Sequence, residues 1–184
     1  MSLSTSTHTA PRNEAASPPA PSQSGSDLGL LVLRWAVGLT MAAHGTQKLF
    51  GWFGGGGLDG TAAFFGGSGY AAPETMAVVA GLTETLAGLG LVIGLLTPLA
   101  GAGIVGIMLN AVAVKWGSGF FNPTGIEYDL MLLVAGASLA LAGPGRFAVD
   151  RLLPVLRTHR LSHGAAAVAL GAASAGIVLL TLRG

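Results

Sequence analysis

Polar and ionisable side chains lie inside otherwise apolar stretches of this sequence, and they are the residues best suited to chemistry. His44 and Lys48 are one helical turn apart in the first apolar stretch. Glu84 lies in the second stretch and Asn110 in the third. Ionisable groups are costly within a lipid bilayer and usually mark a pathway or a binding site. The chemistry they favour is hydrogen bonding to a small molecule and proton exchange with it.

The positions of these groups along their helices place them at a similar depth in the membrane. At a rise of about 1.5 Å per residue, His44, Glu84 and Asn110 lie roughly 9–12 Å below the same end of their helices. We therefore predict one polar layer in the outer half of the protein, with Glu84 at its centre and in contact with His44 or Lys48. No residue is assigned to catalysis, and the candidates for ligand binding are His44, Lys48, Glu84, Asn110, Glu127 and Asp129.

Two other interpretations of the polar layer stay open. Glu84 could pair with Lys48 or His44 only to hold two helices in register. Lys48 and Lys115 could instead extend to the lipid headgroups, because long basic side chains bury their stems and keep the charge in water. Arg34 lies in the opposite half, where it can also reach headgroups, and a structural role is favoured for it.

The stretches that carry these residues have the composition of membrane helices. The sequence is 51% hydrophobic and 9% charged, whereas a soluble domain carries about 25% charged residues. A helix needs about 20 residues to cross the bilayer, and the stretch 128–142 is short by that measure. The sequence thus predicts an all-α membrane protein, a four-helix transmembrane bundle with a fifth C-terminal transmembrane helix, from helices at 28–50, 76–97, 98–116, 128–142 and 164–182.

The chain divides into three predicted parts. Residues 1–26 are rich in Ser, Thr, Pro and Ala and offer no apolar face to bury, so we expect a disordered tail. Residues 27–153 form the four-helix domain, in which the aromatic connection 51–75 is expected to hold a short helix on the membrane surface. Residues 154–184 add a basic connection and the extra helix.

Small residues predict a close contact between the second and third helices, which follow one another with almost no loop. Gly90 and Gly94 in the second helix are four residues apart, as are Ala102 and Gly106 in the third. Small residues at this interval let two helix backbones approach closely. Chance spacing in a chain rich in Ala and Gly is the alternative.

Arginines indicate the orientation in the membrane. The connection between the fourth and fifth helices contains Arg146, Arg151, Arg157 and Arg160. Because basic residues are enriched in cytoplasmic connections, we expect this connection and the N-terminus in the cytoplasm and the C-terminus outside.

Composition argues against several other functions. The chain has no cysteine, which excludes disulfides, thiol redox chemistry and Cys-ligated clusters. Its net charge of +1 provides no basic field for nucleic acid. We expect no metal site, because His159 and His163 have no third ligand near them in the sequence. His44 is the one histidine in a predicted membrane helix, which excludes a bis-histidine haem held within a single chain.

A series of short motifs runs along the chain in a defined order. Its members are Arg34, Gly38, His44, Gly45, Lys48, Phe65, Pro73, Glu84, Gly88, Gly94, Gly143, Pro144, Gly145, Arg146 and Asp150. In this order and spacing, residues 28–153 resemble the DoxX family of membrane proteins. The resemblance implies structural motif roles for Arg34, Gly45, Gly143, Pro144, Gly145 and Asp150.

The resemblance also implies a four-helix bundle in the bacterial cytoplasmic membrane. The family takes its name from subunits linked to a terminal quinol oxidase. Some members are associated with thiosulfate:quinone oxidoreduction, and others with membrane complexes for oxidative-stress defence. The N-terminal tail and the fifth helix depart from the family pattern, which leaves the partners of this chain open.

Three functions are compatible with the sequence. The first is a redox-associated subunit, without a demonstrated activity of its own, that binds a quinone in the polar layer and works beside a redox enzyme complex. The second is a scaffold that docks a soluble oxidoreductase on the basic connection. The third is a carrier for a small solute or a proton, although the chain lacks an obvious inverted repeat.

Overall fold

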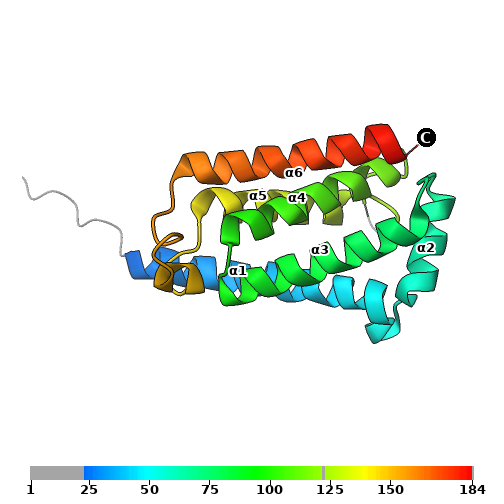
Figure 1. Cartoon of the computed structure of the whole chain (residues 1–184). Coiled ribbons are helices and arrows are strands. Elements are labelled where there is room, and N and C mark those ends of the chain that lie inside the picture. The colour runs from blue at the N-terminus through cyan, green and yellow to red at the C-terminus, as the bar shows by residue number, and fades with distance from the viewer. Residues whose placement is uncertain (1–22, 122, 184) are drawn as a thin grey trace, which may run out of the picture.

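Five long helices run side by side in the computed structural model, which describes residues 23–121 and 123–183 (Figure 1). A shorter helix, α2, lies across one end of them. The described residues contain no strand, although Tyr70 and Arg183 form an isolated bridge. The helices are α1 (Gln23–Phe50), α2 (Gly57–Gly67), α3 (Pro73–Ile93), α4 (Thr97–Val114), α5 (Glu127–Ala142) and α6 (Leu161–Leu182), with 3₁₀ turns at Trp52–Gly54 and Val149–Leu152.

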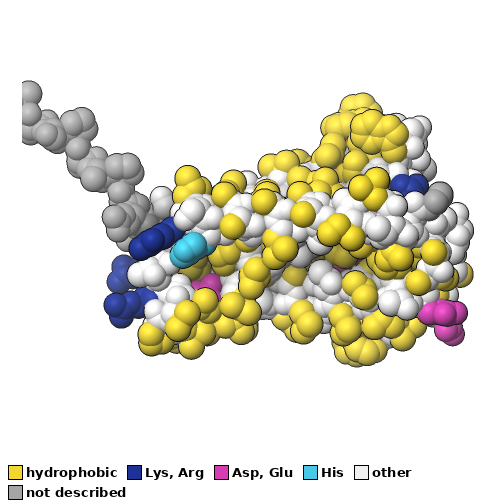
Figure 2. All heavy atoms as spheres, turned by 45° about the horizontal axis from the view of Figure 1, so that its top comes forward, with side chains coloured by type: hydrophobic (Ala, Val, Ile, Leu, Met, Phe, Trp, Pro, Cys, Tyr) yellow, Lys and Arg dark blue, Asp and Glu magenta, His cyan; other side chains and the backbone are white. Residues whose placement is uncertain are grey.

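Four of these helices, α1, α3, α4 and α6, are long and apolar enough to cross a membrane. Helix α5 has 16 residues and is shorter, as its sequence predicts. Hydrophobic side chains cover most of the middle of the face seen in Figure 2, and Lys and Arg gather at one end. The predicted all-α membrane fold is therefore confirmed, with an apolar C-terminal helix packed on α4 and α5.

Helix boundaries differ from the predicted ones at both ends of the chain. Helix α1 begins at Gln23, so the last residues of the segment predicted as a tail are helical. The carboxylate of Asp27 accepts a hydrogen bond from the Arg146 backbone N–H at 2.9 Å, which ties the start of α1 to the connection after α5. Residues 1–22 of the predicted tail lie outside the described residues. At the other end, α6 begins at Leu161 rather than Gly164.

The closest helix contact joins α1 to α3, and glycines make it possible. A Cβ atom added to Gly88 would lie 2.4 Å from the backbone nitrogen of Ala42. One added to Gly45 would lie 2.2 Å from the Thr85 hydroxyl oxygen and 2.7 Å from the Gly81 carbonyl oxygen. Real side chains do not fit at such distances, so the two backbones approach as closely as they do only because these positions lack a Cβ.

The small residues of α4 face a different helix from the predicted one. Gly106 approaches Gly171 and Ser174 of α6, and Ala102 lies so close to Gly171 that no Cβ fits there. The prediction that Ala102 and Gly106 pack on α3 is therefore wrong. The turn between α3 and α4 is as tight as predicted, because Gly94 adopts a positive φ of 73° and ends α3 there.

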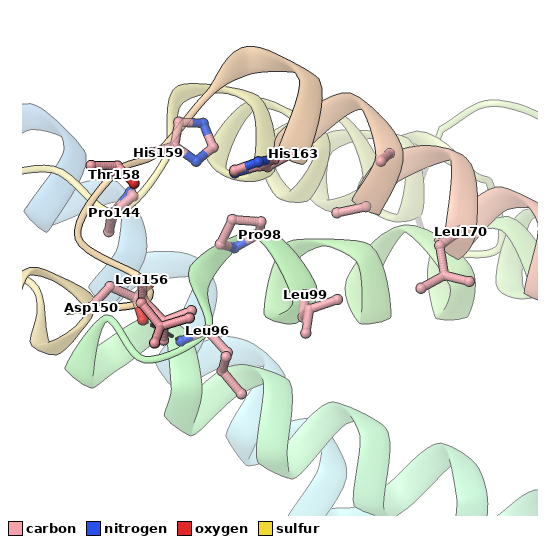
Figure 3. A pocket seen from close by; sticks show the side chains of 13 residues that line it. Leu96, Pro98, Leu99, Pro144, Asp150, Leu156, Thr158, His159, His163 and Leu170 are labelled. Carbon is pink, nitrogen blue, oxygen red and sulfur yellow. Dashed lines mark hydrogen bonds between the residues drawn. The ribbon is translucent and has the colours of Figure 1, made fainter. Parts of the chain in front are cut away.

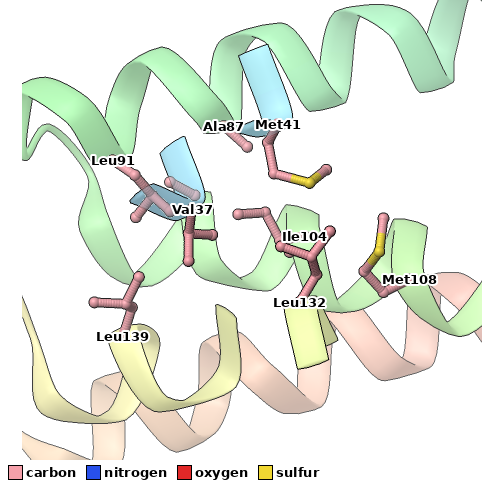
Figure 4. Close-up of a cluster of buried hydrophobic side chains, with 9 residues drawn as sticks. Val37, Met41, Ala87, Leu91, Ile104, Met108, Leu132 and Leu139 are labelled. Atoms are coloured by element: carbon pink, nitrogen blue, oxygen red, sulfur yellow. The ribbon is translucent and has the colours of Figure 1, made fainter. Parts of the chain in front are cut away.

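The hydrophobic core lies among α1, α3, α4 and α5. Met41, Leu91, Ile104 and Leu139 are fully buried in it (Figure 4). A second cluster, formed by Phe65, Tyr70, Met76, Ala77 and Ala80, packs α2 onto the start of α3. The C-terminal end of α6 also holds this region, since the Ala71 N–H donates to the Leu182 carbonyl at 2.7 Å and Arg183 Nε donates to the Ser68 carbonyl at 3.2 Å.

Candidate functional site

An ion pair between α1 and α3 forms the centre of the outer polar groups. Lys48 Nζ donates to Glu84 Oε2 at 2.6 Å. The Glu84 side chain is 3% exposed and that of Lys48 is 28% exposed. The glycine contacts at Gly45 and Gly81 bring the two backbones together and so place the carboxylate within reach of the ammonium group. The predicted contact of Glu84 with Lys48 is confirmed.

A second ion pair joins the end of α4 to the start of α5. Lys115 Nζ lies 2.8 Å and 3.1 Å from the two carboxylate oxygens of Asp129. The aspartate is buried, whereas the lysine is partly exposed. Each buried carboxylate near the outer end of the bundle therefore has its own lysine. An unpaired carboxylate in this environment would be strongly destabilising.

Neutral hydrogen-bonding groups lie beside the two ion pairs. His44 Nε2 is 3.0 Å from the Tyr128 hydroxyl, and His44 Nδ1 is 3.0 Å from Gln47 Oε1. The Tyr70 hydroxyl donates to Asn110 Oδ1 at 3.0 Å. Burial raises the pKa of the Tyr70 phenol, so the hydroxyl keeps its proton and remains a donor near neutral pH. The amide of Asn110 is oriented by its own hydrogen bond to the Gly106 carbonyl at 2.9 Å.

These groups line one cavity of about 530 Å³, which we call the outer cavity. Its walls come from α1 to α6 and are mainly apolar. The cavity reaches the surface beside Phe64 and Val79, which are 57% and 47% exposed. Its polar lining consists of His44, Lys48, Tyr70, Thr83, Glu84, Asn110, Lys115, Tyr128, Asp129 and Ser174.

Five of the six residues proposed from the sequence as ligand-binding candidates line the outer cavity, and Glu127 is the exception among the described residues. Glu127 begins α5, and its backbone N–H donates to the Phe120 carbonyl at 2.9 Å. Sequence reasoning did not select Tyr70, Tyr128 or the α6 wall. Tyr70 lies in a connection and Tyr128 at the start of a helix, where the helical repeat does not show which way a side chain points. The α6 residues in the lining are small or apolar, and such side chains do not by themselves indicate a binding site.

A second polar network lies at the opposite end of the bundle. The Arg34 side chain is 1% exposed and donates to the backbone carbonyls of Leu91, Phe147 and Pro144. The distances from Arg34 Nε to Leu91 O and from Nη2 to Phe147 O are 3.0 Å and 2.8 Å. Arg34 is therefore buried and bound to backbone carbonyls, and it does not extend to the headgroups, which was the alternative to the structural role favoured from the sequence.

Asp150 completes this network by capping the start of α4. Its carboxylate accepts hydrogen bonds from the backbone N–H groups of Leu96 at 2.7 Å and Thr97 at 2.9 Å. Its own N–H donates to the Gly94 carbonyl at 2.9 Å. Gly143 and Gly145, with φ of 83° and 69°, shape the intervening loop. The motif residues at this end thus join α1, the α3–α4 turn and the loop after α5.

Metal ligands do not gather anywhere in the described part of the chain, where no group of three or more His, Asp or Glu side chains could hold an ion. The outer cavity instead offers paired charges and hydroxyl, imidazole and amide groups around an apolar space. This is the usual form of a site for an organic small molecule.

The long apolar helices and the hydrophobic surface around them define a multi-pass membrane protein. Residues 29–116 match the family model of DoxX, which confirms the resemblance noted in the sequence. The match covers α1 to α4 and ends before the loop at 143–150. Comparison with curated proteins and with solved structures gave no match.

Proposed function

We propose that this protein is a redox-associated membrane subunit that binds a quinone or quinol in the outer cavity. The observation that carries the proposal is the composition of the cavity, in which apolar walls surround a small set of convergent polar groups. A quinone has the same division, with an apolar ring and tail and two polar oxygens. The match to DoxX adds support through the family's association with quinol oxidation.

Charge balance favours a neutral ligand. Lys48 is paired with Glu84 and Lys115 with Asp129, so neither lysine is left without an anion. An acidic ligand would have to displace one of the buried carboxylates, which is costly. Carbonyl and hydroxyl oxygens, by contrast, can hydrogen-bond to the Tyr128 hydroxyl, the His44 imidazole or the Asn110 amide. Imidazole and carboxylate groups are also suited to proton exchange with a quinol.

The route into the cavity is consistent with a lipid-soluble ligand. The cavity reaches the surface beside α3 and α2, where Val79 and Phe64 are exposed. Val79 belongs to the membrane-spanning helix α3 and Phe64 to the short helix α2 at its end, so a hydrophobic molecule can enter between them from the bilayer. A water-soluble solute has no such advantage, which makes this route an argument against the carrier.

Purification in a mild detergent, followed by identification of the bound lipophiles by mass spectrometry, tests the proposal. We expect a quinone at near-stoichiometric amount, and saturable binding of an added short-chain quinone to the delipidated protein. Absence of both would contradict the proposal. A soluble oxidoreductase that co-purifies stoichiometrically without any quinone would support the scaffold instead.

A further inference from the structure

A second cavity of about 400 Å³ lies at the end of the bundle opposite the outer cavity (Figure 3). We call it the basic-end groove. It lies between the first turns of α4 and the first half of α6, under the connection that follows α5. Its apolar wall includes Pro98, Leu99, Ala167 and Leu170, and Leu99 and Leu170 are about half exposed on the lipid-facing flank.

Basic residues lie in and next to the chain segment that lines one end of this groove. His159 and His163 line it, and Arg157 and Arg160 flank His159 in the chain. Both arginines are exposed, and neither guanidinium has a hydrogen-bond or ion-pair partner among the described residues. The one acidic residue in the lining, Asp150, is buried, accepts hydrogen bonds from two backbone N–H groups and forms no ion pair with either arginine.

The rim of the groove is held in place by α5. His159 Nε2 is 2.9 Å from the Leu141 carbonyl. The imidazole ring lies against Gly143, where an added Cβ would be 2.5 Å from two ring carbons. The positive φ of Gly143 and the absence of its side chain therefore fix the position of His159. His159 is therefore held in place before any ligand binds.

We propose that the basic-end groove binds one anionic phospholipid. Its phosphate lies among Arg157, Arg160 and His163, and one acyl chain follows Leu99 and Leu170 between α4 and α6. Arginine is the side chain best suited to a phosphate, because its planar fork can donate two parallel hydrogen bonds. Anionic headgroups are also attracted to basic clusters close to a membrane helix. This site is independent of the quinone proposed for the outer cavity.

A lipid fits the groove better than a soluble acidic protein does. The arginines alone would suit either partner, but the groove continues from them along exposed leucines on the apolar flank of α4 and α6. That flank faces hydrocarbon in a membrane and is closed to a water-soluble protein. A molecule that joins a phosphate to an alkyl chain uses both parts of the groove.

Native mass spectrometry of the detergent-purified full chain, titrated with phosphatidylglycerol or phosphatidylcholine, tests the proposal. We expect one phosphatidylglycerol to be retained selectively. The double variant Arg157→Gln/Arg160→Gln should bind it about 25-fold more weakly, at about fivefold for each arginine. Ala166→Phe, which fills the groove without changing charge, should also weaken binding. Unchanged thermal stability of each variant would show that it is folded.

Arg146→Gln is the matched control, because it removes one positive charge from the same end, whereas Arg146, unlike Arg157 and Arg160, is not next to Thr158 and His159 of the lining in the chain. It should leave phosphatidylglycerol binding within twofold of that of the parent protein. Equal retention of the two lipids, or an equal loss in Arg146→Gln and in the single variant Arg157→Gln, would overturn the proposal. The proposal would also be overturned if the protein showed no lipid selectivity but bound an acidic soluble protein, and the Ala166→Phe variant still bound that protein.

Discussion

The substitution Glu84→Gln separates a binding role of the outer cavity from a purely structural one. It keeps the size of the side chain and removes its charge, so Lys48 loses its anion. Breaking an ion pair that is buried on both sides costs about 3–5 kcal/mol. Here the Lys48 side chain is 28% exposed. The glutamine oxygen can also still accept a hydrogen bond from it, so we expect a loss of only about 1–2 kcal/mol.

The informative measurement is quinone binding compared with stability in the same preparations. If the cavity binds a quinone, Glu84→Gln should remain folded in detergent but bind a short-chain quinone at least tenfold more weakly. Glu74→Gln is the control, since Glu74 is an exposed residue in the first turn of α3 and lies outside the cavity lining. A folded Glu84→Gln protein that binds quinone as tightly as the Glu74→Gln protein would refute the assignment of Glu84 to the quinone site and leave that residue only a structural role.

Four other outcomes follow from the structure. Gly45→Leu should destabilise the protein by about 3 kcal/mol or more, measured by thermal unfolding in detergent, because its side chain would overlap the α3 backbone. Asp150→Ala should cost about 2 kcal/mol in the same assay, since it removes the cap of α4. Cysteines introduced at Ser22 and Gly184 should be labelled from the inside and the outside of the cell respectively, and labelling from the same side would contradict the proposed orientation. Deletion of residues 1–22 should leave detergent thermostability nearly unchanged, whereas a large loss of folded protein would mean that this segment packs on the bundle.

The ion pair of Lys48 with Glu84 shows what the sequence could predict. Depth follows from the constant rise of a helix, and neighbours in sequence tend to be antiparallel neighbours in a bundle. Two charged groups at equal depth on adjacent helices are therefore expected to meet. The number of long helices and the short α2 could also be predicted, because both follow from local composition.

Contacts that depend on packing order could not be predicted in this way. Ala102 and Gly106 have the spacing of a close contact, but the spacing does not say whether α3 or α6 provides the partner. Arg34 is another case, since its carbonyl partners include Pro144 and Phe147, more than 100 residues away in the chain. A local pattern can show that a buried cation needs oxygens around it, but not which loop supplies them.

The two ends of the bundle are held together by different contacts. At the basic end, Arg34 and Asp150 hold the α3–α4 turn and the loop after α5 through backbone hydrogen bonds. At the other end, the connections around α2 and between α4 and α5 contain several glycines in positive-φ conformations and exposed aromatic residues. At the outer end, hydrogen bonds join the connection after α2 to the C-terminal end of α6, so we expect these two elements to move together when a large ligand enters the outer cavity. The Arg34 and Asp150 hydrogen bonds lie at the opposite end and are not broken by such a movement, so loading the outer cavity should leave the affinity of the basic-end groove unchanged.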